Sequence, residues 1–197
     1  MGATPDQTRI PAIPVREWPE EMRKALAALY PEGAARPTLR SEGRPKALNA
    51  LGTFAWHPTL TQAFNTFNGH LLYTSTLSDR HRELLVLRVA VVRGAEYERR
   101  QHVVLAADVG ISREEIGWIT EGPDAAGWVV PLERAMVRAV DELVTDARIT
   151  DATWGELAAE LRTEQLMALV FTVGAYDLLA MAFRSFGVVS DEDLPAT

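Results

Sequence analysis

The chain has 197 residues, 47% of them hydrophobic, which is enough for one domain with a substantial core, or for one domain with an N-terminal elaboration. Its formal net charge is −7 and its Lys and Arg residues are spread along the chain. This disfavours a nucleic-acid partner, because phosphate binding needs a concentrated cationic face. The sequence contains no cysteine, which excludes disulfides, thiolate nucleophiles and thiol redox cycles.

The N-terminal segment predicts extended backbone. Residues 1–17 contain three prolines and little apolar periodicity, which favours an arm over a helix. The segment has no apolar stretch followed by a cleavage site, so we expect no secretory signal and, by default, a cytoplasmic location. The longest apolar-rich stretch, residues 166–183, is interrupted by polar residues. It therefore predicts a buried helix, and we expect no membrane partner.

From Pro19 onward the spacing of apolar residues is helical, and Pro31-Glu32-Gly33 is expected to end the first helix. Further helices are predicted over residues 46–56, 59–73, 79–93, 95–109, a short stretch from 112, 131–145, 151–161 and 164–186. Ser78 is expected to cap one helix, and Ser112 with Glu115 matches a capping box at the start of another. Since no strand pair or hairpin is convincing, the predicted fold class is all-α, a bundle of helical hairpins.

Three polar residues on two consecutive predicted helices are expected to face the core. His102 shares an apolar stripe with Ala106 and Val109, and Glu98 lies one turn earlier on the same stripe. On the preceding helix, Glu83 lies among apolar residues. Carboxyl and imidazole groups in a dry pocket suit proton transfer, because burial and neighbouring charges move their pKa values toward neutrality.

Two other interpretations stay open on spacing alone. Glu98 and His102 could form a surface pair one turn apart, with Glu83 paired to Arg80, since such pairs are common on helices. Alternatively, a metal-dependent enzyme could use Glu83, Glu98 and His102 as ligands, although no second histidine lies at metal spacing.

Residues 77–110 resemble the carboxymuconolactone decarboxylase-like family, which includes the alkylhydroperoxidase AhpD-like proteins. The likeness rests on Arg-x-Arg-Glu-Leu at 80–84, Leu-Arg-Val-Ala at 87–90, Gly-Ala-Glu-Tyr-Glu at 94–98, and His102. It implies an AhpD-like bundle of helical hairpins. It also implies a division into an N-terminal arm and helix (1–44), a family domain (45–187) and a C-terminal tail (188–197).

The AhpD-like branch that this chain resembles has a signature of a glutamate, a Cys-x-x-Cys pair and a histidine. In this chain the glutamate falls on Glu83 and the histidine on His102, whereas the cysteine positions fall on Ala95 and Glu98. Without either thiol, a peroxide-reducing cycle is excluded. The proton-handling part of the site remains.

The resemblance then implies a decarboxylase-type lyase, or a related proton-transfer enzyme, that needs no metal or organic cofactor and acts on a small lactone or carbonyl acid. His102 is expected to be the principal acid and base, Glu98 to share or shuttle the proton, and Glu83 to orient the imidazole. Tyr97 is a candidate for substrate contact. The competing prediction is a non-catalytic, oligomeric ligand-binding or scaffold protein of the same fold.

Members of this family resemble one another in forming trimers or rings of subunits, which implies a homo-oligomer with a trimer or hexamer favoured over a dimer. Four tryptophans offer aromatic surface that an interface could bury: Trp18, Trp118, Trp128 and Trp154. The sequence identifies neither the substrate nor the pathway.

Overall fold

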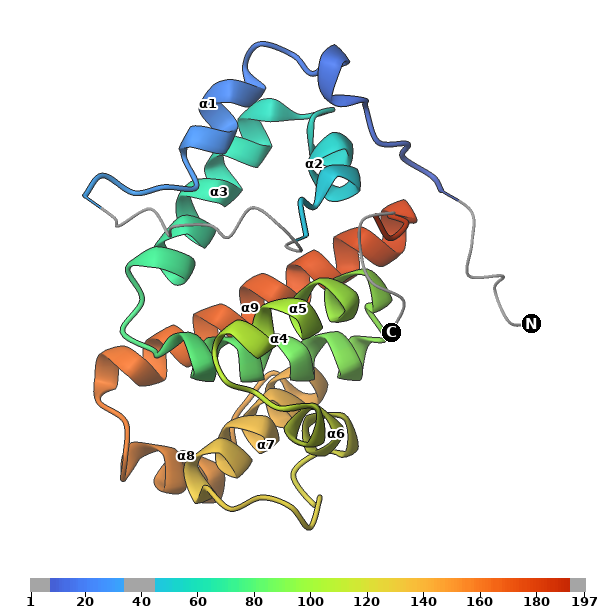
Figure 1. Cartoon of the computed structure of the whole chain (residues 1–197). Coiled ribbons are helices and arrows are strands. Elements are labelled where there is room, and N and C mark those ends of the chain that lie inside the picture. The colour runs from blue at the N-terminus through green and yellow to red at the C-terminus, as the bar shows by residue number, and fades with distance from the viewer. Residues whose placement is uncertain (1–7, 34–44, 192–197) are drawn as a thin grey trace. The chain divides into compact units, whose positions relative to one another are not determined.

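The computed structural model describes residues 8–33 and 45–191, and within these ranges the regular structure is entirely helical (Figure 1). The predicted all-α class is therefore confirmed. The chain divides into two compact units, one made of residues 1–74 and 181–197 and the other of residues 75–180. The division expected from the family likeness, with boundaries after residues 44 and 187, stays a prediction.

The first unit holds a 3₁₀ turn, Val15–Glu17, and the helices α1 (Met22–Ala27), α2 (Leu48–Phe54) and α3 (Pro58–Tyr73). Of the arm expected over residues 1–17, residues 8–14 are not helical, as the prolines predicted, whereas Val15–Glu17 form the 3₁₀ turn, and residues 1–7 lie outside the described residues. Helix α3 begins where the sequence predicted. The ring of His57 accepts a hydrogen bond from the backbone N–H of Leu60 at 3.3 Å, and proline occupies the first helical position.

The second unit contains α4 (Asp79–Arg93), α5 (Glu96–Asp108), α6 (Arg113–Glu121), α7 (Pro131–Asp146), α8 (Asp151–Ala158) and most of α9 (Thr163–Phe186). Helix α4 is its central element, because every residue from Leu84 to Ala90 is buried. A helix was predicted over residues 79–93, and this prediction is confirmed.

Local signals fix the ends of α4 and the start of α6. The hydroxyl of Ser78 accepts a hydrogen bond from the backbone N–H of His81 at 3.1 Å, and Gly94 ends α4 in the left-handed conformation with φ of 59°. At α6, both bonds of the predicted capping box are present, at 2.8 and 3.2 Å between Ser112 and Glu115. These boundaries were predictable because each depends on residues within one turn of the helix end.

Helix α9 is long and apolar enough to cross a membrane by length and composition, with a mean hydropathy of 1.9 over its most apolar window. Half of that window is buried inside the protein. Because a core helix passes the same test, the finding is weak support for a membrane span, and the absence of a membrane partner stays a prediction.

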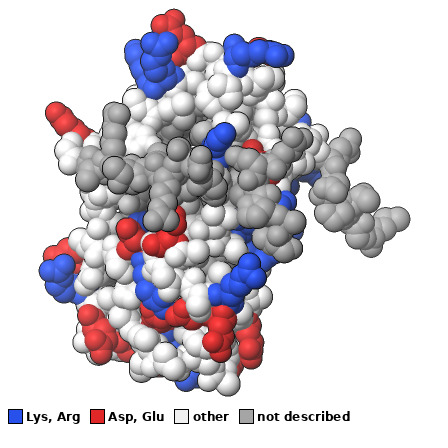
Figure 2. All heavy atoms as spheres, in the orientation of Figure 1, with Lys and Arg blue, Asp and Glu red and all other residues white. Residues whose placement is uncertain are grey.

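Charged side chains of both signs are interspersed on the face drawn in Figure 2, as far as the described residues show. This arrangement agrees with the spread of Lys and Arg along the sequence. The prediction that no nucleic acid binds rests on that composition.

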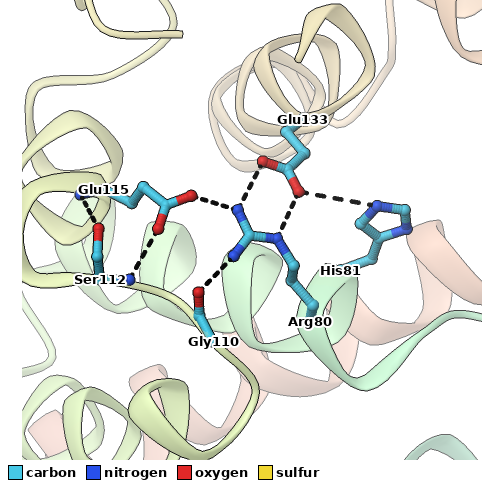
Figure 3. A network of polar contacts seen from close by, with 6 residues as sticks. All are labelled: Arg80, His81, Gly110, Ser112, Glu115 and Glu133. Atoms are coloured by element: carbon cyan, nitrogen blue, oxygen red, sulfur yellow. Dashed lines mark hydrogen bonds and ion pairs between the residues drawn. The ribbon is translucent and has the colours of Figure 1, made fainter. Parts of the chain in front are cut away.

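An ion-pair network around Arg80 joins α4 to α6 and α7 (Figure 3). The guanidinium donates to both carboxylate oxygens of Glu133, at 2.7 and 3.0 Å, and to the backbone carbonyl of Gly110 at 2.8 Å. It also bonds to the carboxylate of Glu115. Glu133 is only 5% exposed, so its charge depends on this partner.

A second arginine, Arg88, lies further along α4 and also bonds to α6 and α7. Its side chain is buried and donates to both oxygens of Asp141, at 2.6 and 2.7 Å. It also donates to the backbone carbonyls of Ile119 and Thr120, at 2.9 and 3.0 Å, close to the end of α6. The two arginines therefore anchor α4 against the helices that follow it in the chain.

The Arg80 network predicts a loss of stability when its cation is removed. In Arg80→Met, the buried carboxylate of Glu133 loses its partner, and we expect the free energy of unfolding in urea to fall by about 3 kcal/mol. The matched control is Arg148→Met, since the side chain of Arg148 is 74% exposed. The control should change stability by less than about 0.5 kcal/mol. An equally small loss in Arg80→Met would contradict the role of the network.

Candidate active site

The helical hairpin of α4 and α5 brings two of the predicted site residues into contact. Nδ1 of His102 lies 2.7 Å from Oε2 of Glu83, and the two residues are nineteen positions apart in the sequence. Glu83 is 3% exposed, and the side chain of His102 is 12% exposed. The hairpin turns at Gly94, which ends α4 in the left-handed backbone conformation.

This contact fixes the orientation of the imidazole. When Nδ1–H donates to the carboxylate of Glu83, the other ring nitrogen of His102, Nε2, remains available to accept a proton. On its other side, the carboxylate of Glu83 lies 3.5 Å from a guanidinium nitrogen of Arg82. The ring of Tyr176 on α9 packs edge-on against the imidazole, with centroids 5.2 Å apart and an interplanar angle of 86°.

Glu98, one turn before His102 on α5, is in a different state from Glu83. It is 2% exposed, and neither of its carboxyl oxygens has a hydrogen-bond partner among the described residues. Burial, and then the negative charge of Asp177, raise the pKa of Glu98 to about 9. Its carboxyl group is therefore un-ionised at neutral pH, and it is a potential proton donor.

The two open interpretations of these residues do not fit the structure. His102 bonds to Glu83 and not to Glu98, while Arg80 is bound to the acidic residues of α6 and α7, so the surface pairs considered above are wrong. Within residues 8–33 and 45–191, no group of three or more His, Asp or Glu side chains is placed to hold a metal ion. The metal-dependent alternative therefore lacks the ligand set that it required.

Helix α9 supplies neighbours that the sequence interpretation did not assign to the site. Asp177 receives hydrogen bonds from Arg93 on α4, one of them at 2.9 Å. Close to this pair, Ala180 of α9 forms a buried cluster with Ala90 and Ala95, small residues that let the helices approach closely. The sequence signal for these neighbours was the presence of polar residues within the apolar stretch 166–183. Such residues in a buried helix need polar partners in the core.

The remaining candidate from the sequence is Tyr97, and Arg99 lies two residues further along α5. Tyr97 is 6% exposed and makes contacts within the protein, and its role in substrate contact stays a prediction. Arg99 pairs with Glu96 on the same helix at 2.9 Å. Its guanidinium is therefore already engaged.

Comparison with known families identifies the segment that carries this site. Residues 58–142, which include α3 to α6 and most of α7, match the sequence model of the Carboxymuconolactone decarboxylase family. These residues are similar to that family, and the chain contains no cysteine. The match supports an enzyme-type function for the chain. The search of curated proteins gave no match.

Several solved structures share the fold of this chain. The debrominase Bmp8 in its apo form gives a TM-score of 0.71 at 12% identity, over 95% of this chain and 94% of that one. The alkylhydroperoxidase AhpD core of an uncharacterized peroxidase-related protein from Ralstonia eutropha JMP134 gives 0.70 at 16% identity, over 93% and 94%. A peroxidase-related protein from Silicibacter sp. TM1040 gives 0.66 at 14% identity, over 74% and 77%. At these identities the likeness shows the fold alone.

The raised pKa of Glu98 predicts a pH-dependent stability. The folded chain keeps a proton that the unfolded chain releases above its ordinary pKa of 4.5, up to a folded value of about 9. In that window the unfolded state binds fewer protons, so stability falls as pH rises. Relative to Glu98→Gln, we expect the free energy of unfolding of the unsubstituted chain to fall by up to about 1.4 kcal/mol per pH unit.

Denaturant unfolding at several pH values between about 5.5 and 8.5 measures this difference. The control is Glu114→Gln, because Glu114 is exposed on the first turn of α6 and its substitution should leave the pH dependence unchanged. Parallel curves for the unsubstituted chain and Glu98→Gln would show that Glu98 ionises normally in the folded protein.

Proposed function

We propose that this protein is a cofactor-independent enzyme of the decarboxylase type, or a related proton-transfer enzyme, acting on a small lactone or carbonyl acid. The observation that carries the proposal is the pairing of an oriented imidazole with a buried, un-ionised carboxyl group on one helix. His102 bonds to Glu83 at 2.7 Å, and Glu98 lies one turn away without a partner among the described residues. One group can accept a proton and the other can donate one.

Glu83 acts as a positioning residue in this proposal. Its carboxylate accepts from Nδ1 of His102, and the contact with Arg82 on its other oxygen limits its rotation. This arrangement selects the tautomer in which Nε2 of His102 faces the reacting atoms, and it stabilises the imidazolium when Nε2 takes up a proton. His102 is the principal acid and base, because each proton delivered to the substrate passes from solvent through its imidazole to Glu98.

Glu98 is proposed as the store for the transferred proton. In a decarboxylation, the bond between the substrate carbon and its carboxylate breaks, carbon dioxide leaves, and the electron pair remains on the carbon as an enolate of the adjacent carbonyl. That carbon then takes the proton of Glu98, which becomes a carboxylate. His102 returns a proton to Glu98 from solvent and closes the cycle. No oxidant, reductant or metal ion is consumed.

The lack of cysteine separates this proposal from thiol chemistry. The chain has alanine and glutamate at the two cysteine positions that the AhpD-like resemblance implies, so it has no disulfide to reduce. A scaffold role without catalysis predicted either that Glu98 and His102 would face solvent or that the core would be closed with no cavity, and the buried placement of both residues excludes the first of these.

Turnover of 4-carboxymuconolactone is the first test, because the family carries this substrate in its name. Loss of the substrate and release of carbon dioxide are followed by NMR in D₂O, which also records deuterium added to the product carbon. We expect His102→Ala to lower the rate constant at least about 100-fold, with helix content by circular dichroism unchanged, because general acid–base groups contribute this much.

The control is His70→Ala, since His70 is exposed on α3 and its removal should leave turnover unchanged. If 4-carboxymuconolactone is inert, the same assay is run with a set of small keto acids and unsaturated lactone acids. A rate in His102→Ala equal to that of the unsubstituted chain would refute the mechanism. So would the absence of both decarboxylation and deuterium exchange across the set.

The pH profile tests the role of Glu98 separately. The proton donor must be un-ionised, so the rate of the unsubstituted chain should fall as pH rises through the pKa of Glu98, about 9. In Glu98→Gln the donor is lost, and we expect a rate about 100-fold lower with no fall near this pH. A Glu98→Gln variant that retains the alkaline limb of the profile would assign that limb to another group.

A further inference from the structure

The tryptophans expected at an interface make contacts within the chain, and their part in an interface stays a prediction. The rings of Trp118 and Trp128 pack on each other at a centroid distance of 6.0 Å, and the indole N–H of Trp18 donates to the backbone carbonyl of Ile13 at 2.7 Å. Of the four, Trp154 alone remains among the exposed residues, at 44%. Aromatic surface on these side chains is therefore largely used within the chain.

A different apolar surface lies on one face of α9. Four large apolar side chains of this helix are each between 50% and 57% exposed: Met167, Phe171, Leu178 and Met181. Together with Gly174, which is also exposed, they recur at intervals of four, three, four and three residues. This spacing is the repeat by which one helix packs along another helix, so the α9 face has the pattern of a helix–helix contact.

The glycine at the centre of this face has no explanation within the chain. A Cβ atom placed on Gly174 would meet nothing within 4 Å, so neither packing nor backbone conformation requires glycine there. In a helix interior, glycine is less favourable than alanine because it loses more conformational freedom on folding. Glycine on an exposed helix face allows the backbone of a second helix to approach closely.

The face is arranged symmetrically around this glycine. Met167 and Met181 lie seven residues before and after Gly174, and the two ends of the helix carry opposite charges at equal distance, Glu164 ten residues before it and Arg184 ten residues after it. Both charged residues are exposed. A helix with this arrangement is complementary to a second copy of itself turned end for end.

We propose that two copies of the chain associate through this α9 face, with the helices antiparallel and Gly174 at the twofold axis. Each exposed methionine then lies opposite the methionine at the other end of the partner helix. Glu164 of one copy lies near Arg184 of the partner subunit, about 15 Å from the axis along the helix. Such a contact is isologous, so the assembly contains an even number of subunits, as a dimer or a hexamer does. This inference does not depend on the proposed chemistry.

Because the chain has no cysteine, a single introduced thiol reports on the axis directly. In Gly174→Cys, a short bifunctional maleimide should join two copies, since the two thiols face each other across the axis. The control is Val129→Cys, because Val129 is the most exposed of the large apolar residues at 82% but lies off α9. Cross-linking confined to Gly174→Cys supports the proposal, and its absence from that variant overturns it.

Exchange of the terminal charges tests the antiparallel direction. By light scattering over a range of concentrations, Glu164→Arg and Arg184→Glu should each weaken association, because like charges then meet, while the double exchange should restore it. Leu178→Glu should abolish it without loss of helix content. A monomeric unsubstituted chain, an odd-numbered assembly, or single exchanges without effect would overturn the proposal. So would Leu178-dependent binding of a monomer to phosphatidylcholine vesicles, which would assign the face to lipid.

Discussion

A carboxyl group taken out of water without a cation beside it keeps its proton, and this constraint governs the core of the second unit. Glu98 is 2% exposed and its two oxygens lack partners among the described residues. An ionised group in that position would be costly, so burial raises the pKa to about 9 and the group stays neutral. A neutral acid can lie beside the Glu83–His102 pair without repelling its negative charge. In the AhpD-like resemblance Glu98 stands at the second cysteine position, and we propose that it serves there as a proton donor.

The helices of the second unit are joined by ion pairs that do not include Glu98. Arg80 and Arg88 bind acidic residues and carbonyls of α6 and α7, and Arg93 binds Asp177 of α9. Each cation therefore has its own partner, and none of these three pairs includes a carboxyl oxygen of Glu98. The negative charge of Asp177 adds to burial in raising the pKa of Glu98. The ion pairs that stabilise the fold thus leave Glu98 without a cation, and this keeps its pKa high.

The helices were largely predictable from sequence, and the site was predictable only in part. Helix α4 runs from Asp79 to Arg93 as predicted, because Ser78 and Gly94 act within one turn of its ends. Spacing placed Glu98 and His102 on one stripe, but it could not show that His102 turns to Glu83, because that choice depends on how α4 and α5 pack. Tyr176 and Asp177 come from a helix more than seventy residues further along the chain, and nothing local connects them to α5. The role of the four tryptophans in an interface stays a prediction, because spacing along one chain does not show which surface meets a second subunit.

The ionisation of Glu98 can be observed without any substrate. In the protein labelled with ¹³C at glutamate side-chain carboxyl groups, one resonance should be missing from Glu98→Gln, and its titration in the unsubstituted chain should have a midpoint at about pH 9. Such a midpoint would establish a neutral acid at the centre of the site. A Glu98 resonance that titrates with those of the exposed glutamates, near their ordinary pKa of 4.5, would contradict the account.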